Sequence, residues 1–78
     1  MTLTIISPEK TVFQGEVTSA TFPGASGSFT VLNNHAPIIS TLTAGTVVYA
    51  GSDQQKNEVN ISGGIVEVHA NVITLCIK

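Results

Sequence analysis

Two histidines, one cysteine and five acidic residues are the side chains of this chain best suited to acid–base, nucleophilic or metal chemistry. A nucleophilic triad needs a base beside a nucleophile and a carboxylate that orients the base. The only close pair is Glu67 and His69, which lie two residues apart and would share one face of a strand. We interpret that pair as exposed surface rather than as a catalytic dyad.

Metal and phosphate chemistry are not indicated either. A metal centre needs three or four converging His, Cys or carboxylate ligands, and His35, His69 and Cys76 are far apart in the sequence. The Gly-rich stretch PGASGS (23–28) lacks the lysine and the strand-to-helix context of a phosphate-binding loop. The sequence therefore predicts a binding or structural module with no catalytic, cofactor-binding or metal-binding residues, and not an enzyme.

Charge is scarce in this chain. Charged residues make up 10% of it, whereas soluble domains average about 25%. No residue between Val17 and Ser52 carries a formal charge, and His35 is the only group there that titrates near neutral pH. Because interface cores are depleted in charge, a partner could cover this surface. The alternative is a β domain whose polar surface consists of Ser, Thr and Asn, and composition leaves both open.

Several classes of protein are excluded by simple counts. A net charge of −2 provides no basic field for nucleic acid. The apolar runs are only a few residues long, short of the roughly 20 that a membrane-spanning helix needs. The start MTLTIISPEK lacks the basic region of a signal peptide. With 78 residues and one cysteine, we expect a single domain over 1–78 without an internal disulfide, which suits a reducing compartment.

The predicted elements are all strands. Val, Ile and Thr are abundant, turn residues recur at short intervals, and no window has the period of an amphipathic helix. Gly15 suggests a bulge or bend, and Gly63-Gly64 is a two-residue hairpin signal. We predict an all-β fold, a flattened β-sandwich or barrel of roughly eight to ten short, mainly antiparallel strands. The expected strands are 3–7, 11–22, 29–32, 36–41, 45–50, 57–62, 65–69 and 72–78, with turns at 22–28, 51–56, 63–64 and 70–71.

The order of four motifs is more specific than any one of them. SPEKTVFQGEV, FPGASGSFTVLNNHAPIIS, ISGGIVEV and NVITL follow one another along the chain. Together they resemble the amino-terminal β-sandwich domain of the epsilon subunit of F-type ATP synthases, called delta in mitochondria. Thr30 stands where that family commonly has glycine, and Asn33 where it commonly has proline. Both changes suit a strand followed by a turn.

The resemblance implies a non-catalytic rotor role. In this family the domain sits in the central stalk between the gamma subunit and the c-subunit ring, so that proton-driven rotation is coupled to ATP synthesis. It would be a peripheral membrane protein on the cytoplasmic side of the bacterial inner membrane. Carried over by position, Ser26, Ser28 and Phe29 would face the c ring, and Ser7, His35 and Ser40 would face gamma. Some members carry an acidic residue at the position of Ser28.

Two alternatives stay open at this stage. In the first reading of His35, its side chain is a polar anchor for gamma. In the second, it bonds a neighbouring backbone group and only shapes the loop before Pro37. The rival to the whole assignment is a free-standing all-β ligand-binding or carrier domain, which needs a pocket of convergent polar groups. Family members often continue into a carboxy-terminal helical hairpin linked to inhibition, and this sequence stops at Lys78. We therefore expect no hairpin-based inhibition from residues 1–78.

Overall fold

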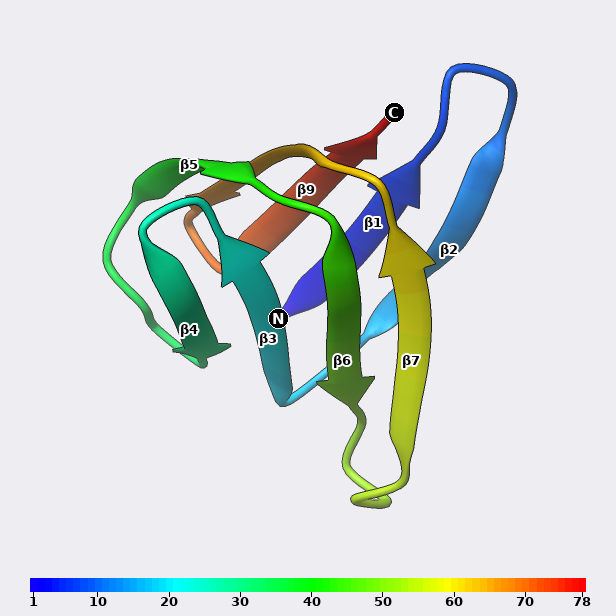
Figure 1. Cartoon of the computed structure of the whole chain (residues 1–78). Coiled ribbons are helices and arrows are strands. Elements are labelled where there is room, and N and C mark those ends of the chain that lie inside the picture. The colour runs from blue at the N-terminus through cyan, green and yellow to red at the C-terminus, as the bar shows by residue number, and fades with distance from the viewer.

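The computed structural model describes all residues from 1 to 78, and each of its elements is a strand (Figure 1). This confirms the predicted all-β class. No helix in the chain has the length and hydropathy to span a membrane. The nine strands are β1 (Thr2–Ile6), β2 (Thr11–Glu16), β3 (Ser19–Gly24), β4 (Gly27–Leu32), β5 (Ile38–Leu42), β6 (Gly45–Ala50), β7 (Lys56–Ile61), β8 (Gly64–His69) and β9 (Val72–Ile77).

The strands form two facing layers (Figure 1). The first layer has the order β2-β1-β9-β8-β5, and the second has the order β4-β3-β6-β7. The layers meet at one corner, where Gly24 of β3 pairs with Leu42 of β5. Strands β1 and β9 run parallel, and every other pairing is antiparallel. The molecule is therefore a curled sheet folded over on itself into a flattened sandwich.

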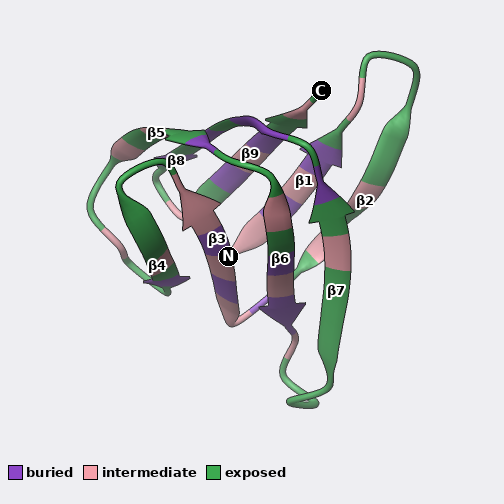
Figure 2. Ribbon diagram, in the orientation of Figure 1, coloured by how far each residue is buried: buried purple, intermediate pink, exposed green.

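Alternating side chains from both layers fill the interior. Strand β8 shows the pattern most clearly, since buried and exposed residues alternate along its whole length. Figure 2 shows the same alternation as buried bands along the strands. Fully burying one such side chain contributes roughly 1.5–3 kcal/mol, and no polar side chain is buried among them. The largest fully buried side chains are Phe22, Leu3, Ile5, Ile73, Leu75, Val31, Val47, Val66 and Val68.

Two pairs of aromatic rings pack against each other in this fold. The rings of Phe13 on β2 and Tyr49 on β6 lie 4.5 Å apart between centroids, and those of Phe22 and Phe29 lie 5.6 Å apart. Both separations suit tilted aromatic packing. A Cβ atom on Gly15 would lie 3.0 Å from Cζ of Phe13, so glycine at this position leaves room for the ring. The Phe13–Tyr49 contact thus joins β2 of the first layer to β6 of the second, whereas Phe22 and Phe29 are paired neighbours within the second layer.

The predicted bulge lies elsewhere, and the predicted 11–22 segment is two strands. Gly15 pairs regularly with Leu3, and the register shift leaves Val12 as the extra residue of β2. The chain then crosses between layers at residues 17–18. There the Val17 N–H donates to Met1 O at 2.8 Å, and the Thr18 N–H donates to Ala50 O at 2.8 Å. Hydrophobic alternation alone could not show this change of partner.

The prediction of a hairpin at Gly63-Gly64 is wrong. Strand β7 pairs with β6, whereas β8 pairs with β5 and β9, so the two glycines carry the chain from one layer to the other. Gly63 has a φ of 150°, which favours glycine. A Cβ atom on Gly64 would lie 2.4 Å from the carbonyl oxygen of Cys76. Glycine is required here by a close approach to β9, not by a tight turn.

Candidate interaction surfaces

The three residues expected to face the ring lie together on the β3–β4 hairpin. Ser26 is in its two-residue turn, and Ser28 and Phe29 belong to β4. The segment 22–28, predicted as a turn, is therefore mostly paired strand. The two serines are exposed, whereas Phe29 is half-buried and packs its ring against Phe22. The serine side chains are available to a partner, and the Phe29 ring fixes the hairpin to the core.

Three hydrogen bonds fix this hairpin to the end of β5 and to the connection that follows it. The Ala25 N–H donates to Thr41 O at 2.9 Å, and the Thr43 N–H donates to Pro23 O at 2.9 Å. The hydroxyl of Thr43 donates to the same carbonyl oxygen at 3.2 Å. The hairpin tip is thus a backbone-bonded corner of the molecule rather than a free loop.

The three residues expected to face gamma do not converge on one point. Ser7 follows β1 and Ser40 lies on β5, with β9 and β8 between those two strands. At about 4.8 Å between neighbouring strands, they are roughly 14 Å apart across the layer. His35 lies in the loop between β4 and β5. The family resemblance predicts one shared interface for these three residues. In the fold, Ser7 and Ser40 are spread across the first layer, and His35 lies in the β4–β5 loop that leads into it.

Both of these serine hydroxyls are bonded within the chain. Ser7 Oγ accepts from the Lys10 N–H at 3.2 Å and from the Glu9 N–H at 3.4 Å, and donates to Lys10 O at 3.1 Å. Ser7 therefore closes the β1–β2 turn. Ser40 Oγ donates to Thr41 O at 3.2 Å. Both serines are half-buried, so each has a local structural role in this chain.

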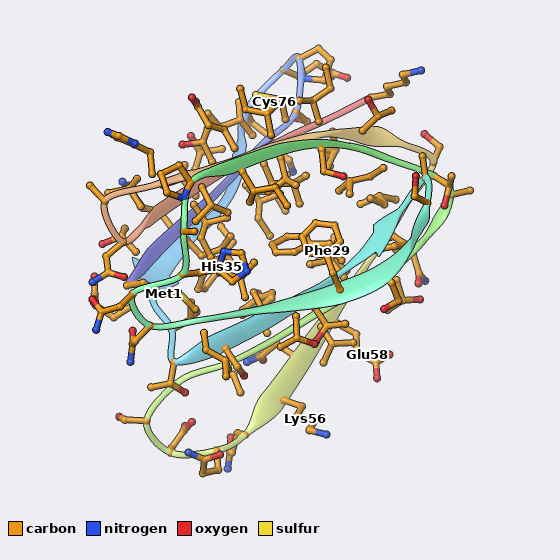
Figure 3. All side chains as sticks on the ribbon, turned by 90° about the vertical axis from the view of Figure 1, so that its left-hand side faces the viewer. Met1, Phe29, His35, Lys56, Glu58 and Cys76 are labelled. Carbon is orange, nitrogen blue, oxygen red and sulfur yellow. The ribbon has the colours of Figure 1, made fainter.

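His35 is half-buried in the loop that precedes Pro37. Its backbone N–H donates to Leu32 O at 3.2 Å, and its Nδ1 lies 2.7 Å from Ala36 O. A carbonyl oxygen can only accept, so this contact places the hydrogen on Nδ1. In the neutral imidazole Nε2 is then the unprotonated nitrogen, and it can accept from a partner. Figure 3 shows the His35 ring beside the loop that carries it.

The outer face of the first layer exposes large apolar side chains. Ile39 on β5 is 72% exposed and Ile65 on β8 is 54% exposed. Ile65 pairs with Cys76 on β9, which in turn pairs with Ile6 on β1, so these three form one row across the sheet. Cys76 is an exposed free thiol within that row. We call this surface the apolar outer face, although exposed Glu67 and His69 also lie on it.

The apolar outer face contains no chemically active motif, so the sequence motifs did not predict it. The alternation of side chains along the strands is the signal that could have predicted it. Val66 and Val68 alternate along the expected strand 65–69, and both are buried. Strand parity then turns Ile65 and Glu67 outward together. Adjacent isoleucines at 38–39 likewise cannot both face the core, and Ile39 is the exposed one.

Glu67 and His69 are exposed, as predicted, and two open hollows flank them on β8. Both hollows are lined by Glu67 and His69. The first is also lined by Pro37, Ile38, Ile39 and Val68. The second is also lined by Ala70, Val72 and Thr74. No group of three His, Cys, Asp or Glu residues is arranged to hold a metal ion.

Residues 1–78 match the family model described as ATP synthase, Delta/Epsilon chain, beta-sandwich domain. The chain belongs to this family. The match covers the whole length of the chain, which confirms the resemblance carried by the four ordered motifs. The delta/epsilon beta-sandwich domain also accounts for the absence of helices from the fold.

Bacterial epsilon chains are similar to this member of the delta/epsilon family. The ATP synthase epsilon chain of Chlorobaculum tepidum is 41% identical over 70 residues, which are 90% of this chain and 80% of the relative. That of Leptospira borgpetersenii is 37% identical over 75 residues, which are 96% of this chain and 58% of the relative. The chain thus spans between about three fifths and four fifths of these relatives.

Solved structures show the same delta/epsilon fold. A chain of the Euglena gracilis mitochondrial ATP synthase superimposes with a TM-score of 0.90 at 23% identity, covering 96% of this chain and 48% of the other. A chain of the Tetrahymena thermophila mitochondrial ATP synthase central stalk and c ring gives 0.84 at 22% identity, covering 99% of this chain and 62% of the other. The sandwich is therefore shared although most residues differ.

Proposed function

We propose that this chain is a non-catalytic central-stalk component of an F-type proton-translocating ATP synthase. It links gamma to the c-subunit ring so that proton-driven rotation is coupled to ATP synthesis. The observation that carries the proposal is the family match over all 78 residues. It is supported by the 41% identity to the ATP synthase epsilon chain of Chlorobaculum tepidum.

The proposed partners are therefore gamma and the c ring, without nucleic acid, a small-molecule substrate or direct insertion into the membrane. The proposed location is the cytoplasmic side of the bacterial inner membrane, as a peripheral part of the complex. The names of the bacterial epsilon-chain relatives support this location. A net charge of −2 is consistent with protein partners rather than nucleic acid.

The mechanical role calls for a body that transmits torque without deforming. An apolar, closely packed interior resists deformation, and the interior of this sandwich contains no buried polar side chain. The bonded β3–β4 corner presents the hydroxyls of Ser26 and Ser28 to the ring, with Phe29 holding the hairpin on the core. Ser28 replaces an ion pair by hydrogen bonding. An exposed ion pair is worth only ~0–1 kcal/mol, so this contact can persist without one.

On the gamma side, the proposed contact combines His35 with the apolar outer face. Ile39 and Ile65 supply exposed apolar area on the first layer, and Nε2 of His35 supplies a hydrogen-bond acceptor at its entrance loop. Ser7 and Ser40 lie on the same layer and keep their turn and strand in place. The two alternatives for His35 are therefore compatible, because one ring nitrogen shapes the loop and the other remains free.

The test compares two histidines by titrating the domain with isolated gamma. We expect His35→Ala to weaken binding by about tenfold, because it removes one hydrogen bond and the loop contact beneath it. His69→Ala is the comparison and should weaken binding less, because the His69 side chain makes no hydrogen bond within the chain, although it lies on the same outer face as Ile65. Equal losses in the two variants would count against the assignment of His35. Gamma and the c ring should also co-purify with the wild-type chain.

A further inference from the structure

We propose that Asn71 is a positioning residue for the loop 33–37, and through it for His35. The Asn34 N–H donates to Asn71 Oδ1 at 2.7 Å, and Asn71 Nδ2 donates to Asn34 Oδ1 at 3.0 Å. These two residues are 37 positions apart in the sequence. The pair therefore joins the β4–β5 loop to the β8–β9 turn by two hydrogen bonds in opposite directions.

The backbone presents both amides for this contact. Asn34 has a φ of 65° and Asn71 a φ of 63°, left-handed conformations that asparagine tolerates better than most residues. Asn71 is also fixed from its other side, because its carbonyl oxygen accepts from the Thr2 N–H at 3.0 Å. Asn71 is thus held to β1 through its backbone carbonyl and to the loop through its side chain, whose donor and acceptor are both in use.

The consequence falls on the residue that follows Asn34. His35 is bonded through its N–H to Leu32 O and through Nδ1 to Ala36 O, both within the loop itself. Those bonds set the ring relative to the loop. The Asn71 bonds, together with the bond from the Met1 ammonium to Asn33 Oδ1 at 3.2 Å, set the loop relative to the first layer. The direction of His35 Nε2 therefore depends on a residue that need not touch any partner. Its relevance to gamma binding rests on the proposed function; the loop geometry does not.

Asn71→Gly tests the inference, because glycine adopts the left-handed turn freely and removes only the amide. The readouts are hydrogen exchange of the Asn34 N–H, the imidazole NMR signals of His35, and affinity for gamma. We expect exchange to accelerate and affinity to fall, each by about fivefold to tenfold, the usual scale for one net hydrogen bond. Ala70→Gly is the control at the neighbouring turn position. Residue 70 has no side-chain amide, so this variant should change none of the three readouts.

Two more variants separate positioning from general destabilisation. Asn71→Asp keeps the acceptor for the Asn34 N–H and should recover slow exchange and most of the affinity. Adding Asn34→Gly to Asn71→Gly should cause no further loss, because the Asn34 side-chain oxygen accepts only from Asn71 Nδ2. Asn34→Gly alone should have a smaller effect, because it keeps the backbone N–H that donates to Asn71 Oδ1. Unchanged exchange in Asn71→Gly, or faster exchange with unchanged gamma affinity, overturns the inference. If the wild-type domain fails to bind gamma, the proposed function fails, and exchange and the His35 signals still decide whether Asn71 positions the loop.

Discussion

Glu16 is a residue whose acidity the fold changes. Its pKa is lowered from the ordinary value of 4.5, first because the Thr2 hydroxyl donates a hydrogen bond to Oε2. The amino-terminal ammonium, 3.5 Å from Oε1, lowers the pKa further, while desolvation opposes both. Because the folded pKa lies below the unfolded one, the stabilisation is present above pH 4.5 and is lost as the pH falls through the folded value.

Removing the hydroxyl should return Glu16 towards ordinary behaviour. In Thr2→Val the pKa of Glu16 should rise, measured by NMR titration of its side-chain carboxyl carbon. The Glu16-dependent loss of stability on acidification should shift to higher pH with it. Thr4→Val is the matched control, because Thr4 pairs with Gln14 and Thr74 and makes no bond to Glu16. An unchanged pKa in Thr2→Val would show that the hydroxyl is not the main cause.

The residue features that depend on a local pattern could be predicted from the sequence. The sequence predicted the exposed Glu67–His69 pair from strand parity, and it identified His35 as the one titratable group of an uncharged stretch. It could not reach the contact between Asn34 and Asn71, because no local period relates residues 37 positions apart. Only the three-dimensional arrangement of a loop and a distant turn brings those two amides together.

The β8–β9 turn shows how an element carries a local cost. Ala70 has a φ of 51° and Asn71 a φ of 63°, so both central residues are left-handed, as in a type I′ hairpin. Asparagine or glycine is the usual choice for the first of these positions. Alanine in this region costs roughly 1–2 kcal/mol because its Cβ approaches the following carbonyl oxygen. The element is therefore less stable than its topology allows.

Ala70→Asn should raise stability by about 0.5–1 kcal/mol, since asparagine relieves part of that strain. The measurement is the free energy of unfolding in urea, with an unchanged denaturant slope as evidence for an unchanged fold. Ala25→Asn is the control, because Ala25 is also an exposed turn residue but does not have a positive φ. A gain of equal size in Ala25→Asn would attribute the effect to asparagine in general.

The strands could be predicted far better than their pairing. Alternation in 57–62, 65–69 and 72–78 gave elements close to β7, β8 and β9. The same alternation did not show that β1 runs parallel to β9, or that Gly63 and Gly64 carry the chain between layers. Which strands pair, and in which direction, depends on how the apolar faces of distant strands pack together. The alternation within one strand contains no information about its partner.

The two layers of the molecule expose different kinds of side chain. On the second layer, hydroxyl and amide side chains bond across strands: the hydroxyls of Thr21 and Thr30 lie 2.9 Å apart, and Thr46 Oγ1 donates to Asn60 Oδ1 at 2.8 Å. Five of the six exposed large apolar side chains lie on the first layer, and the sixth, Leu32, lies on β4 of the second. The Ser/Thr/Asn surface suggested by composition thus prevails on the second layer, and the first layer offers more exposed apolar area to a partner.

This division predicts that the two layers respond differently to the loss of apolar surface. Replacing both Ile39 and Ile65 by serine should lower the free energy of unfolding by only about 1–2 kcal/mol, because these side chains are already 72% and 54% exposed in the isolated chain. Binding to gamma should weaken by at least about tenfold, since burying an isoleucine side chain at an interface is worth roughly 1.5–3 kcal/mol.

Leu32→Ser provides the contrast from the second layer. Leu32 is 57% exposed on β4, comparable with Ile65, but it does not belong to the apolar outer face. Titration with gamma should therefore leave the affinity of this variant near that of the wild type. Equal weakening by Leu32→Ser and the double isoleucine variant would mean that exposed apolar area acts without regard to layer. In that case the outer face of β5, β8, β9 and β1 would not be the side that docks.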